Sequence, residues 1–145
     1  LVGSEMCIRD RLDPGQQVEG EHLSFFDLDS VLGRKMLLPF DHNLLVERAR
    51  ERLAAKTVYS SLPLYLLAQT FTVLDALGAV QACLGQAVNN TSLRKRLERL
   101  RELGWVRDTG EKNQPRLGRP QQLYQYTPQG ERPFMFDRSL LPEGA

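Results

Sequence analysis

The second half of the chain contains two different patterns of apolar residues. Leucines recur at every third or fourth position from 93 to 103, which is the spacing of one apolar face of an α-helix. Apolar and aromatic residues then form two short clusters on either side of a loop rich in glycine and proline. The pattern predicts a helix over about 91–103, followed by two strands, 105–107 and 121–127, that pair as a β-hairpin.

A strongly apolar stretch precedes this helix. Residues 57–92 contain a single charged side chain, Asp75. A helix that is apolar nearly all round is either buried in protein or embedded in lipid. A membrane helix over 58–80 would be long enough, but an aspartate near the bilayer centre costs roughly 3 kcal/mol. We therefore expect buried helices here and no membrane association.

Breaker residues divide the apolar stretch. Ser61 and Pro63 suit the first positions of a helix, and Gly78 suits its end. A second, short helix of small residues is then expected over 79–88. Asn89 follows, and asparagine both ends helices and caps the start of the next one. The order is therefore helix, tight turn, helix and hairpin, which is a helix-turn-helix with a wing.

Residues 41–57 are expected to form a helical arm ahead of this unit. Asp41 is a suitable N-cap, and the charged residues after it give a solvated face with pairs at helical spacing. Residues 58–130 then form one winged helix-turn-helix domain. The predicted fold is mainly α with a small β-hairpin: a winged helix-turn-helix preceded by a helical arm.

The two ends of the chain carry less information. Residues 1–11 resemble a translated sequencing-adaptor artefact, so we expect the natural N-terminus to be missing or replaced. Residues 12–40 are a poorly defined or linker segment, with a short helix expected near 25–32 and a short strand near 35–40. Residues 131–145 form a C-terminal tail whose aromatic and leucine side chains could pack back on the domain or on a partner.

Charge is distributed unevenly along the chain. Residues 13–41 carry six acidic and two basic side chains, a net charge of −4, whereas residues 89–119 carry nine basic and four acidic ones, a net charge of +5. The overall net charge of +1 conceals this contrast. A basic segment on the predicted helix and wing indicates a polyanionic partner.

Other chemistry finds little support. Cys7 and Cys83 make neither a disulfide framework nor a metal cluster, and His22 and His42 are isolated in the sequence. We identify no Ser/His/Asp, Cys/His or paired-carboxylate arrangement. The chain is therefore expected not to be an enzyme and to need no metal or other cofactor, and a reducing, cytoplasmic setting is the default.

Two motifs carry a resemblance to a known family. Residues 92–106, Ser-Leu-Arg-Lys-Arg-Leu-Glu-Arg-Leu-Arg-Glu-Leu-Gly-Trp-Val, resemble the recognition helix and first wing strand of prokaryotic winged helix-turn-helix transcriptional regulators. Residues 118–130 are similar to the wing ending of ArsR-like and DeoR-like members. The resemblance covers about 64–130. It departs from the family pattern at Ala87, where these regulators favour glycine, and at Gln86, where they favour an apolar residue.

The resemblance implies where DNA would be contacted. The start of a recognition helix meets base edges in the major groove, where Arg or Lys can pair with guanine and Asn with adenine. A slim Gly/Pro loop fits the minor groove, whose negative potential attracts arginine. The alternative for each residue is a helix cap or an ordinary solvated surface. The candidate DNA-binding residues are Asn89, Asn90, Thr91, Ser92, Arg94, Lys95, Arg99, Lys112, Arg116 and Arg119.

The favoured hypothesis is sequence-specific binding of double-stranded DNA by a transcriptional regulator, with a homodimer formed through helices outside the recognition unit. Two alternatives remain open. The chain could be the winged-helix portion of a larger replication or recombination protein. It could also be a protein-interaction winged helix whose basic surface binds an acidic partner and no nucleic acid.

Overall fold

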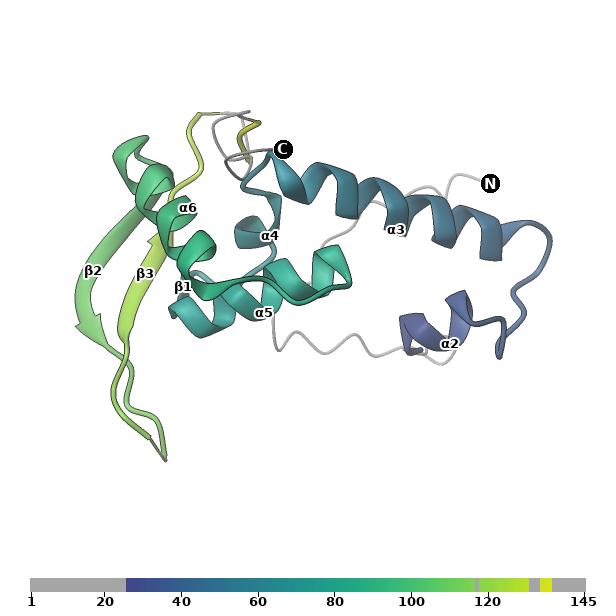
Figure 1. Cartoon of the computed structure of the whole chain (residues 1–145), viewed down its shortest axis with the longest axis horizontal. Helices are drawn as coiled ribbons and strands as arrows, with labels where there is room; N and C mark the ends of the chain where they lie inside the picture. The colour runs from purple at the N-terminus through teal and green to yellow at the C-terminus, as the bar shows by residue number, and fades with distance from the viewer. Residues whose placement is uncertain (1–25, 117, 131–133, 137–145) are drawn as a thin grey trace.

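The computed structural model describes residues 26–116, 118–130 and 134–136. Figure 1 shows α6 and the three strands at one end of the molecule and α2 at the other, with α3 extending between them. In chain order the elements are α2 (Leu28–Leu32), α3 (His42–Val58), α4 (Leu62–Tyr65), β1 (Thr70–Phe71), α5 (Val73–Leu84), α6 (Asn90–Glu102), β2 (Val106–Lys112) and β3 (Gln122–Tyr126).

The strands form one antiparallel sheet in the order β1-β3-β2. The predicted hairpin is present, with Val106 opposite Tyr126. Its first strand is longer than predicted, and the pairing register shifts between Asp108 and Lys112. Gly110 lies in this shift with a φ of 76°, a conformation that suits glycine in a β-bulge. The two-residue strand β1 pairs with the other side of β3 and was not predicted.

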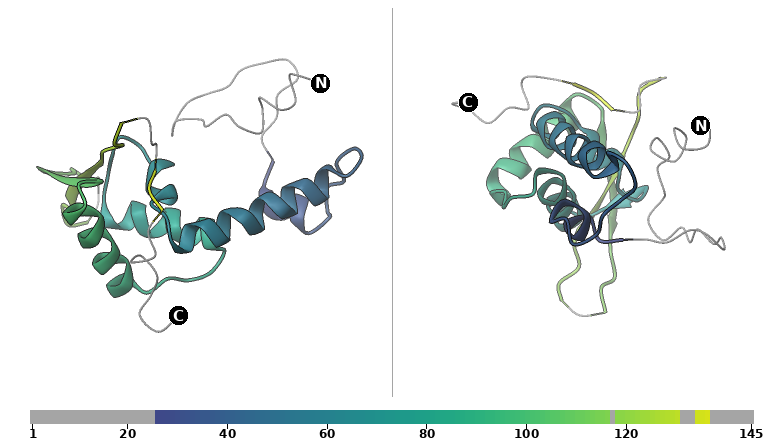
Figure 2. Two further views of the ribbon diagram at one scale, coloured as in Figure 1. Left: turned by 90° about the horizontal axis from the view of Figure 1, so that it is seen from above. Right: turned by 90° about the vertical axis from the view of Figure 1, so that its right-hand side faces the viewer.

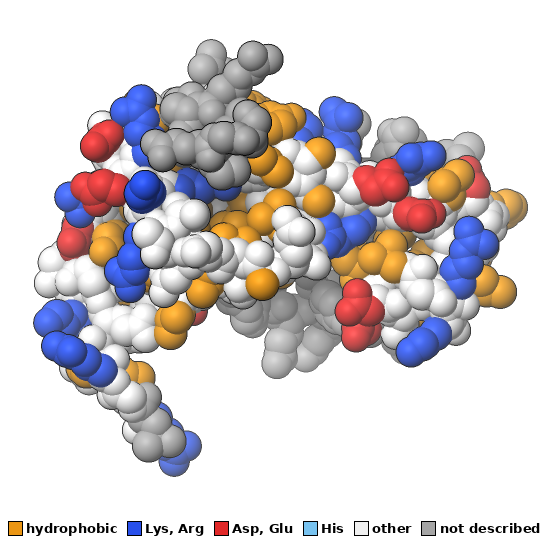
Figure 3. Space-filling view, in the orientation of Figure 1, with side chains coloured by type: hydrophobic (Ala, Val, Ile, Leu, Met, Phe, Trp, Pro, Cys, Tyr) orange, Lys and Arg blue, Asp and Glu red, His pale blue; other side chains and the backbone are white. Residues whose placement is uncertain are grey.

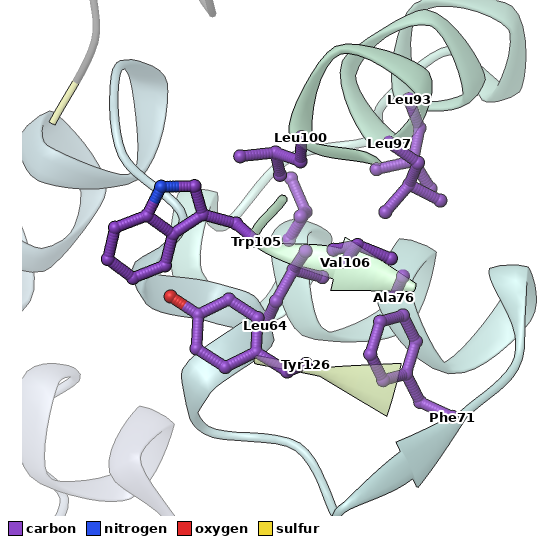
Figure 4. Packing of buried hydrophobic residues seen from close by; sticks show 10 residues of the cluster. Leu64, Phe71, Ala76, Leu93, Leu97, Leu100, Trp105, Val106 and Tyr126 are labelled. Carbon is purple, nitrogen blue, oxygen red and sulfur yellow. The ribbon is translucent and has the colours of Figure 1, made fainter. Parts of the chain in front are cut away.

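The core lies between α6, α5 and the sheet (Figure 4). The predicted leucine stripe faces inward, because Leu93, Leu97 and Leu100 are all buried. Leu100 and Phe71 of β1 are among the largest fully buried side chains. Burial of this stripe removes apolar surface from water and so fixes which side of α6 faces outward.

The apolar stretch before α6 folds differently from the prediction. A single helix from Ser61 to Gly78 was expected, but α4 ends at Tyr65 and α5 begins only at Val73. A capping box starts α5: Asp75 N donates to Thr72 Oγ1 at 3.2 Å, and Thr72 N donates to the Asp75 carboxylate at 2.8 Å. These two bonds satisfy donors that a helix start otherwise leaves unpaired, so the helix begins there.

The predicted break at Gly78 and the separate helix over 79–88 are therefore wrong. Gly78 lies inside α5, which runs on to Leu84. The residue that ends α5 is Gly85, whose φ of 71° places it in the left-handed region that glycine adopts readily. The glycine at the end of α5 is thus Gly85, two residues before Ala87, where the resemblance led us to expect one.

The segment between α2 and α3 is a loop and not the strand expected near 35–40. Asn43 holds it: its side-chain oxygen accepts from Leu38 N at 2.7 Å, and its amide nitrogen donates to Met36 O at 3.0 Å and to Val31 O at 3.1 Å. These bonds replace the ladder that a strand would need. Helix α2 lies within the region where a short helix was expected.

Helix α3, His42–Val58, covers nearly the same residues as the helical arm predicted over 41–57. Asp41 is at its N-cap position, although its side chain makes no capping hydrogen bond. The helix packs against α5 and α4 through its C-terminal part and against α2 at its other end. That α3 acts as an arm towards DNA or a partner stays a prediction.

Part of the expected C-terminal tail packs back on the domain. Ser61 N donates to Met135 O at 3.1 Å, and Met135 N donates to Ser61 Oγ at 3.0 Å. The predictions for residues 1–25, 131–133 and 137–145 fall outside the described residues. Among those that are described, no helix is both long and apolar enough to cross a bilayer.

Candidate nucleic-acid interface

The first turn of α6 is exposed and free of acidic side chains. Asn89 is the N-cap, and its side-chain oxygen accepts from Thr91 N at 2.7 Å. Asn89 therefore acts as a helix cap, which was the alternative to a DNA contact at this residue, and the bond already occupies its side-chain oxygen. Asn90, Thr91 and Ser92 follow as exposed residues. The start of a helix favours an anion such as a phosphate, and no acidic side chain in this first turn opposes one.

The second turn of α6 presents Arg94 and Lys95 to solvent. The buried leucines at 93 and 97 flank them on the helix, so the core fixes the backbone that carries both cations. This is the arrangement needed for side chains that read base edges, because a rigid support limits the ordering cost on binding.

The later turns of α6 carry arginines that already have acidic partners. Arg99 forms an ion pair with Glu102 at 3.1 Å, and Arg101 forms one with Glu98 at 3.0 Å. These exposed pairs contribute little to stability, but they lower the net positive charge of this part of the surface. The candidate Arg99 is therefore less suited to an anion than Arg94 is.

The wing supplies the second basic element. Lys112 ends β2 opposite Gln122, and Arg116 and Arg119 are exposed in the loop beyond it. Asn113 closes the base of the loop. Its backbone N–H donates to Gln121 O at 2.9 Å, and its side-chain oxygen accepts from Gln121 N at 2.7 Å. Lys and Arg side chains gather along this projecting hairpin in Figure 3.

The structure brings the two groups of candidates to one end of the molecule. All ten candidate residues are exposed, and α6 and the β2–β3 wing lie together, away from α2, in the views of Figures 1 and 2. A helix and a neighbouring basic loop on one side of a domain can contact adjacent grooves of one duplex.

Among the basic residues that were not candidates, Arg107, Arg50 and Arg96 donate hydrogen bonds within the domain. Arg107 is exposed on β2 and donates through Nε to Gln125 at 2.7 Å. Arg50 of α3 donates to Cys83 O at the end of α5, at 2.7 Å. Arg96 of α6 is half-buried and donates to the carbonyl oxygens of Thr57 and Ser60.

One sequence signal could have found Arg96. It stands three residues after Leu93 and four before Leu100, which places it at the edge of the leucine stripe and not on the outer face of α6. Its burial lowers its pKa to about 10, so the guanidinium remains charged at neutral pH.

The polar side chains buried inside the domain have structural surroundings. Burial raises the pKa of Tyr126 to about 12, and its hydroxyl shares a 2.7 Å hydrogen bond with Ser61 Oγ. Burial likewise raises the pKa of the Cys83 thiol, which disfavours the reactive thiolate. Within the described residues, no three His, Cys, Asp or Glu side chains come together as metal ligands.

A helix-turn-helix followed by a basic β-hairpin defines the class: this is a winged-helix domain, an architecture that many DNA-binding proteins use. Comparison with protein families gives the particular type. Residues 63–126 match the model described as the NrtR DNA-binding winged helix domain. Over these residues the chain is therefore similar to the NrtR type of winged-helix domain. The match supports the predicted prokaryotic winged-helix regulator, but gives no support to the ArsR-like and DeoR-like resemblance of the wing.

Relatives and solved structures agree with this assignment. The chain is 33% identical, over 128 residues, to the "ADPR responsive transcriptional repressor NtrR" of Acinetobacter baylyi, covering 86% of this chain and 48% of the relative. The crystal structure of Shewanella oneidensis NrtR complexed with a 27mer DNA superposes with a TM-score of 0.58 at 37% identity, over 69% of this chain and 43% of that one.

A second crystal structure of Shewanella oneidensis NrtR gives a TM-score of 0.60 at 35% identity, over 72% of this chain and 44% of that one. The chain is thus homologous to NrtR transcriptional repressors through its winged-helix domain, and it spans about half the length of the relatives it matches.

Proposed function

We propose that this chain binds double-stranded DNA sequence-specifically and regulates transcription, with the start of α6 in the major groove and the wing in the minor groove. One observation carries the proposal: the start of α6, which is exposed and has no acidic residue in its first turn, lies at the same end of the molecule as the basic wing (Figure 1). Its support is the 37% identity to a protein whose crystal structure contains a 27mer DNA.

The proposal assigns different work to the two basic elements. Arg94, Lys95 and Asn90 contact base edges, where each good contact discriminates by about 1–3 kcal/mol. Arg116, Arg119 and Lys112 contact the minor groove and phosphates, which position the protein and make binding sensitive to salt. Thr91, Ser92 and the backbone at Asn89 hold a phosphate, and Arg99 contributes the least because of its pairing with Glu102.

A homodimer belongs to the same proposal. Leu44 and Leu45 near the start of α3 are about half exposed, and Phe40 just before it is 94% exposed. An apolar surface of this kind is typical of a protein contact, and two copies would read two half-sites about one helical turn apart. DNA as the partner also implies a cytoplasmic location.

The test is a DNA-binding titration on a site selected from random duplexes. Replacing Arg94 and Lys95 with Ala should weaken binding at least tenfold, since each lost base contact is worth about 1–3 kcal/mol, and should reduce the preference over scrambled DNA. The matched control replaces Lys35 and Arg48, exposed cations on the α2 side of the molecule, and should bind like the wild type.

Three results are informative. Equal loss in the control and the test variant would mean that net charge alone drives binding. No association of the wild type with DNA at low salt would refute the proposal. In that case, recovery of an acidic protein by the same basic surface would favour the protein-interaction alternative.

A further inference from the structure

Arg96 is a basic residue of α6 whose hydrogen bonds reach the end of another helix. Its Nη2 donates to the carbonyl oxygens of Thr57 and Ser60. Thr57 belongs to the last turn of α3, and Ser60 follows two residues after that helix ends. Carbonyls at a helix C-terminus carry partial negative charge and favour a cation.

Both carbonyls need a donor from outside their own turn. The amide four residues after Thr57 is Ser61 N, which donates instead to Met135 O at 3.1 Å. The amide four residues after Ser60 is Leu64 N, which donates to Ser61 O at 3.0 Å. Thr57 and Ser60 are themselves fully buried, and a buried carbonyl without a partner is costly. Arg96 supplies a donor to both.

This junction joins four parts of the molecule. Ser61 Oγ accepts from Met135 N and shares a hydrogen bond with Tyr126 Oη, while Arg96 binds the carbonyls of Thr57 and Ser60, which precede Ser61 in the chain. The end of α3, the last residue of β3, the returning C-terminal segment and α6 therefore meet at residues 57–61. We call these five residues the α3–α4 junction.

The leucine stripe and Arg96 constrain α6 in different ways. Contacts between leucines and the core are non-directional, so they hold α6 to the core but tolerate a small roll or slide of the helix. Two hydrogen bonds from one guanidinium nitrogen to two carbonyls are directional. They specify both the rotation of α6 about its axis and its position along α3.

We infer that Arg96 is a positioning residue: it sets the orientation of α6, and so the aim of Arg94 and Lys95, from the α3–α4 junction without touching DNA. The inference rests on the proposed DNA-binding function. The inference also gives α3, which lies outside the matched winged-helix segment, a role in DNA binding. Helix α3 supplies the Thr57 carbonyl, the first of the two that fix the position of α6.

Arg50 gives independent support for α3 as the reference element. It donates from the middle of α3 to Cys83 O in the last turn of α5, at 2.7 Å. Gly85 makes room for it: a Cβ at that position would lie 1.9 Å from Arg50 Nη2. Both helices of the helix-turn-helix are thus tied to α3 by an arginine that binds helix-end carbonyls.

The first experiment compares Arg96→Met, Arg96→Lys and Arg101→Met in DNA titrations over a range of salt. Arg101→Met is the matched control, because Arg101 is exposed on the same helix and pairs with Glu98. Arg96→Met should lose at least about fivefold in affinity, comparable to the loss of one base contact, and should lose sequence preference while keeping the wild-type salt slope. Arg96→Lys keeps the charge and should recover part of both, whereas Arg101→Met should keep the sequence preference.

The salt slope and the fold separate the competing explanations. A contact between Arg96 and a phosphate would instead lower the slope by about 0.9 in Arg96→Met, and that result would overturn the inference. A variant that is less stable but binds with full affinity and preference once folded would also overturn it, because Arg96 would then be structural only.

The second experiment does not involve DNA. Spin labels at Glu47→Cys on α3 and Glu102→Cys on α6, in a Cys7→Ser background, report the distance between the helices. The wild type and Arg101→Met should share one narrow distribution, and Arg96→Met should broaden or shift it. An unchanged distribution in Arg96→Met would refute positioning by Arg96. If the wild type bound no DNA, the proposed function would fail, and this measurement would still decide the role of Arg96.

Discussion

Substitutions on the two sides of α6 are expected to differ in effect: those on the inner side should reduce stability, and those on the outer side should reduce DNA binding. The inner side carries Leu93, Leu97 and Leu100, which are buried against α5 and the sheet. The outer side begins with Asn90, Arg94 and Lys95, which are exposed. Packing against the core determines which residues of α6 face inward, and the residues of the outer side stay exposed to solvent, where a ligand could reach them. Substitutions on one helix are therefore expected to affect stability and DNA binding separately.

Leu100→Ala should have the largest effect, and on stability. Leu100 is fully buried, and removing a leucine side chain from a core costs about 2–5 kcal/mol. Urea unfolding followed by circular dichroism measures the loss. Glu98→Ala, two residues away and exposed, is the control and should change stability by less than about 1 kcal/mol. Similar losses in the two variants would contradict the assignment of inner and outer sides.

Gly85→Ala should have the next largest effect, at the turn that leads into α6. The left-handed conformation at Gly85 costs a residue with a Cβ roughly 1–2 kcal/mol, and the added carbon would displace Arg50. Thermal unfolding should show a clear decrease in Tm. Gly78→Ala is the matched control, because nothing lies within 4 Å of a Cβ there. Alanine in a helix interior is favourable by roughly 1 kcal/mol, so this variant should be at least as stable as the wild type.

Arg119→Ala should have the smallest effect, and only on binding. Arg119 is exposed in the wing, so its loss should leave unfolding unchanged. Loss of one phosphate or minor-groove contact should reduce the salt slope by about 0.9 and weaken binding mainly at sites with A/T-rich flanks. A large fall in Tm would show that the wing arginine supports the fold and would weaken the separation of roles.

Local sequence signals predicted the helix and hairpin well. The leucine spacing identified the buried side of α6, and the Gly/Pro loop between two apolar clusters identified the wing. These elements depend on patterns within a few residues of each other. The cap at Asn89 was also predictable, because asparagine suits that position for a local reason.

Signals that depend on tertiary structure were missed or misjudged. The strand β1 is two residues long and exists because Phe71 and Thr70 pair with β3, which lies over fifty residues later. Gly78 suggested a helix end, but the Thr72–Asp75 capping box and Gly85 define α5. The box and Gly85 are both local sequence signals, but the choice of Gly85 over Gly78 as the helix end depends on how α5 packs. Arg96 was not among the candidate residues, and its carbonyl partners lie over thirty residues earlier in the chain.

The most direct test of the account is a dimethyl sulfate footprint of the wild-type chain on a selected duplex. This reagent methylates guanine N7 in the major groove and adenine N3 in the minor groove, so it reports both contacts at once. The account predicts protection of guanine N7 that disappears when Arg94 and Lys95 are replaced with Ala, and protection of adenine N3 beside it that disappears in Arg119→Ala. Protection that is unchanged in both variants, or a bound duplex with no protected base in either groove, would contradict it.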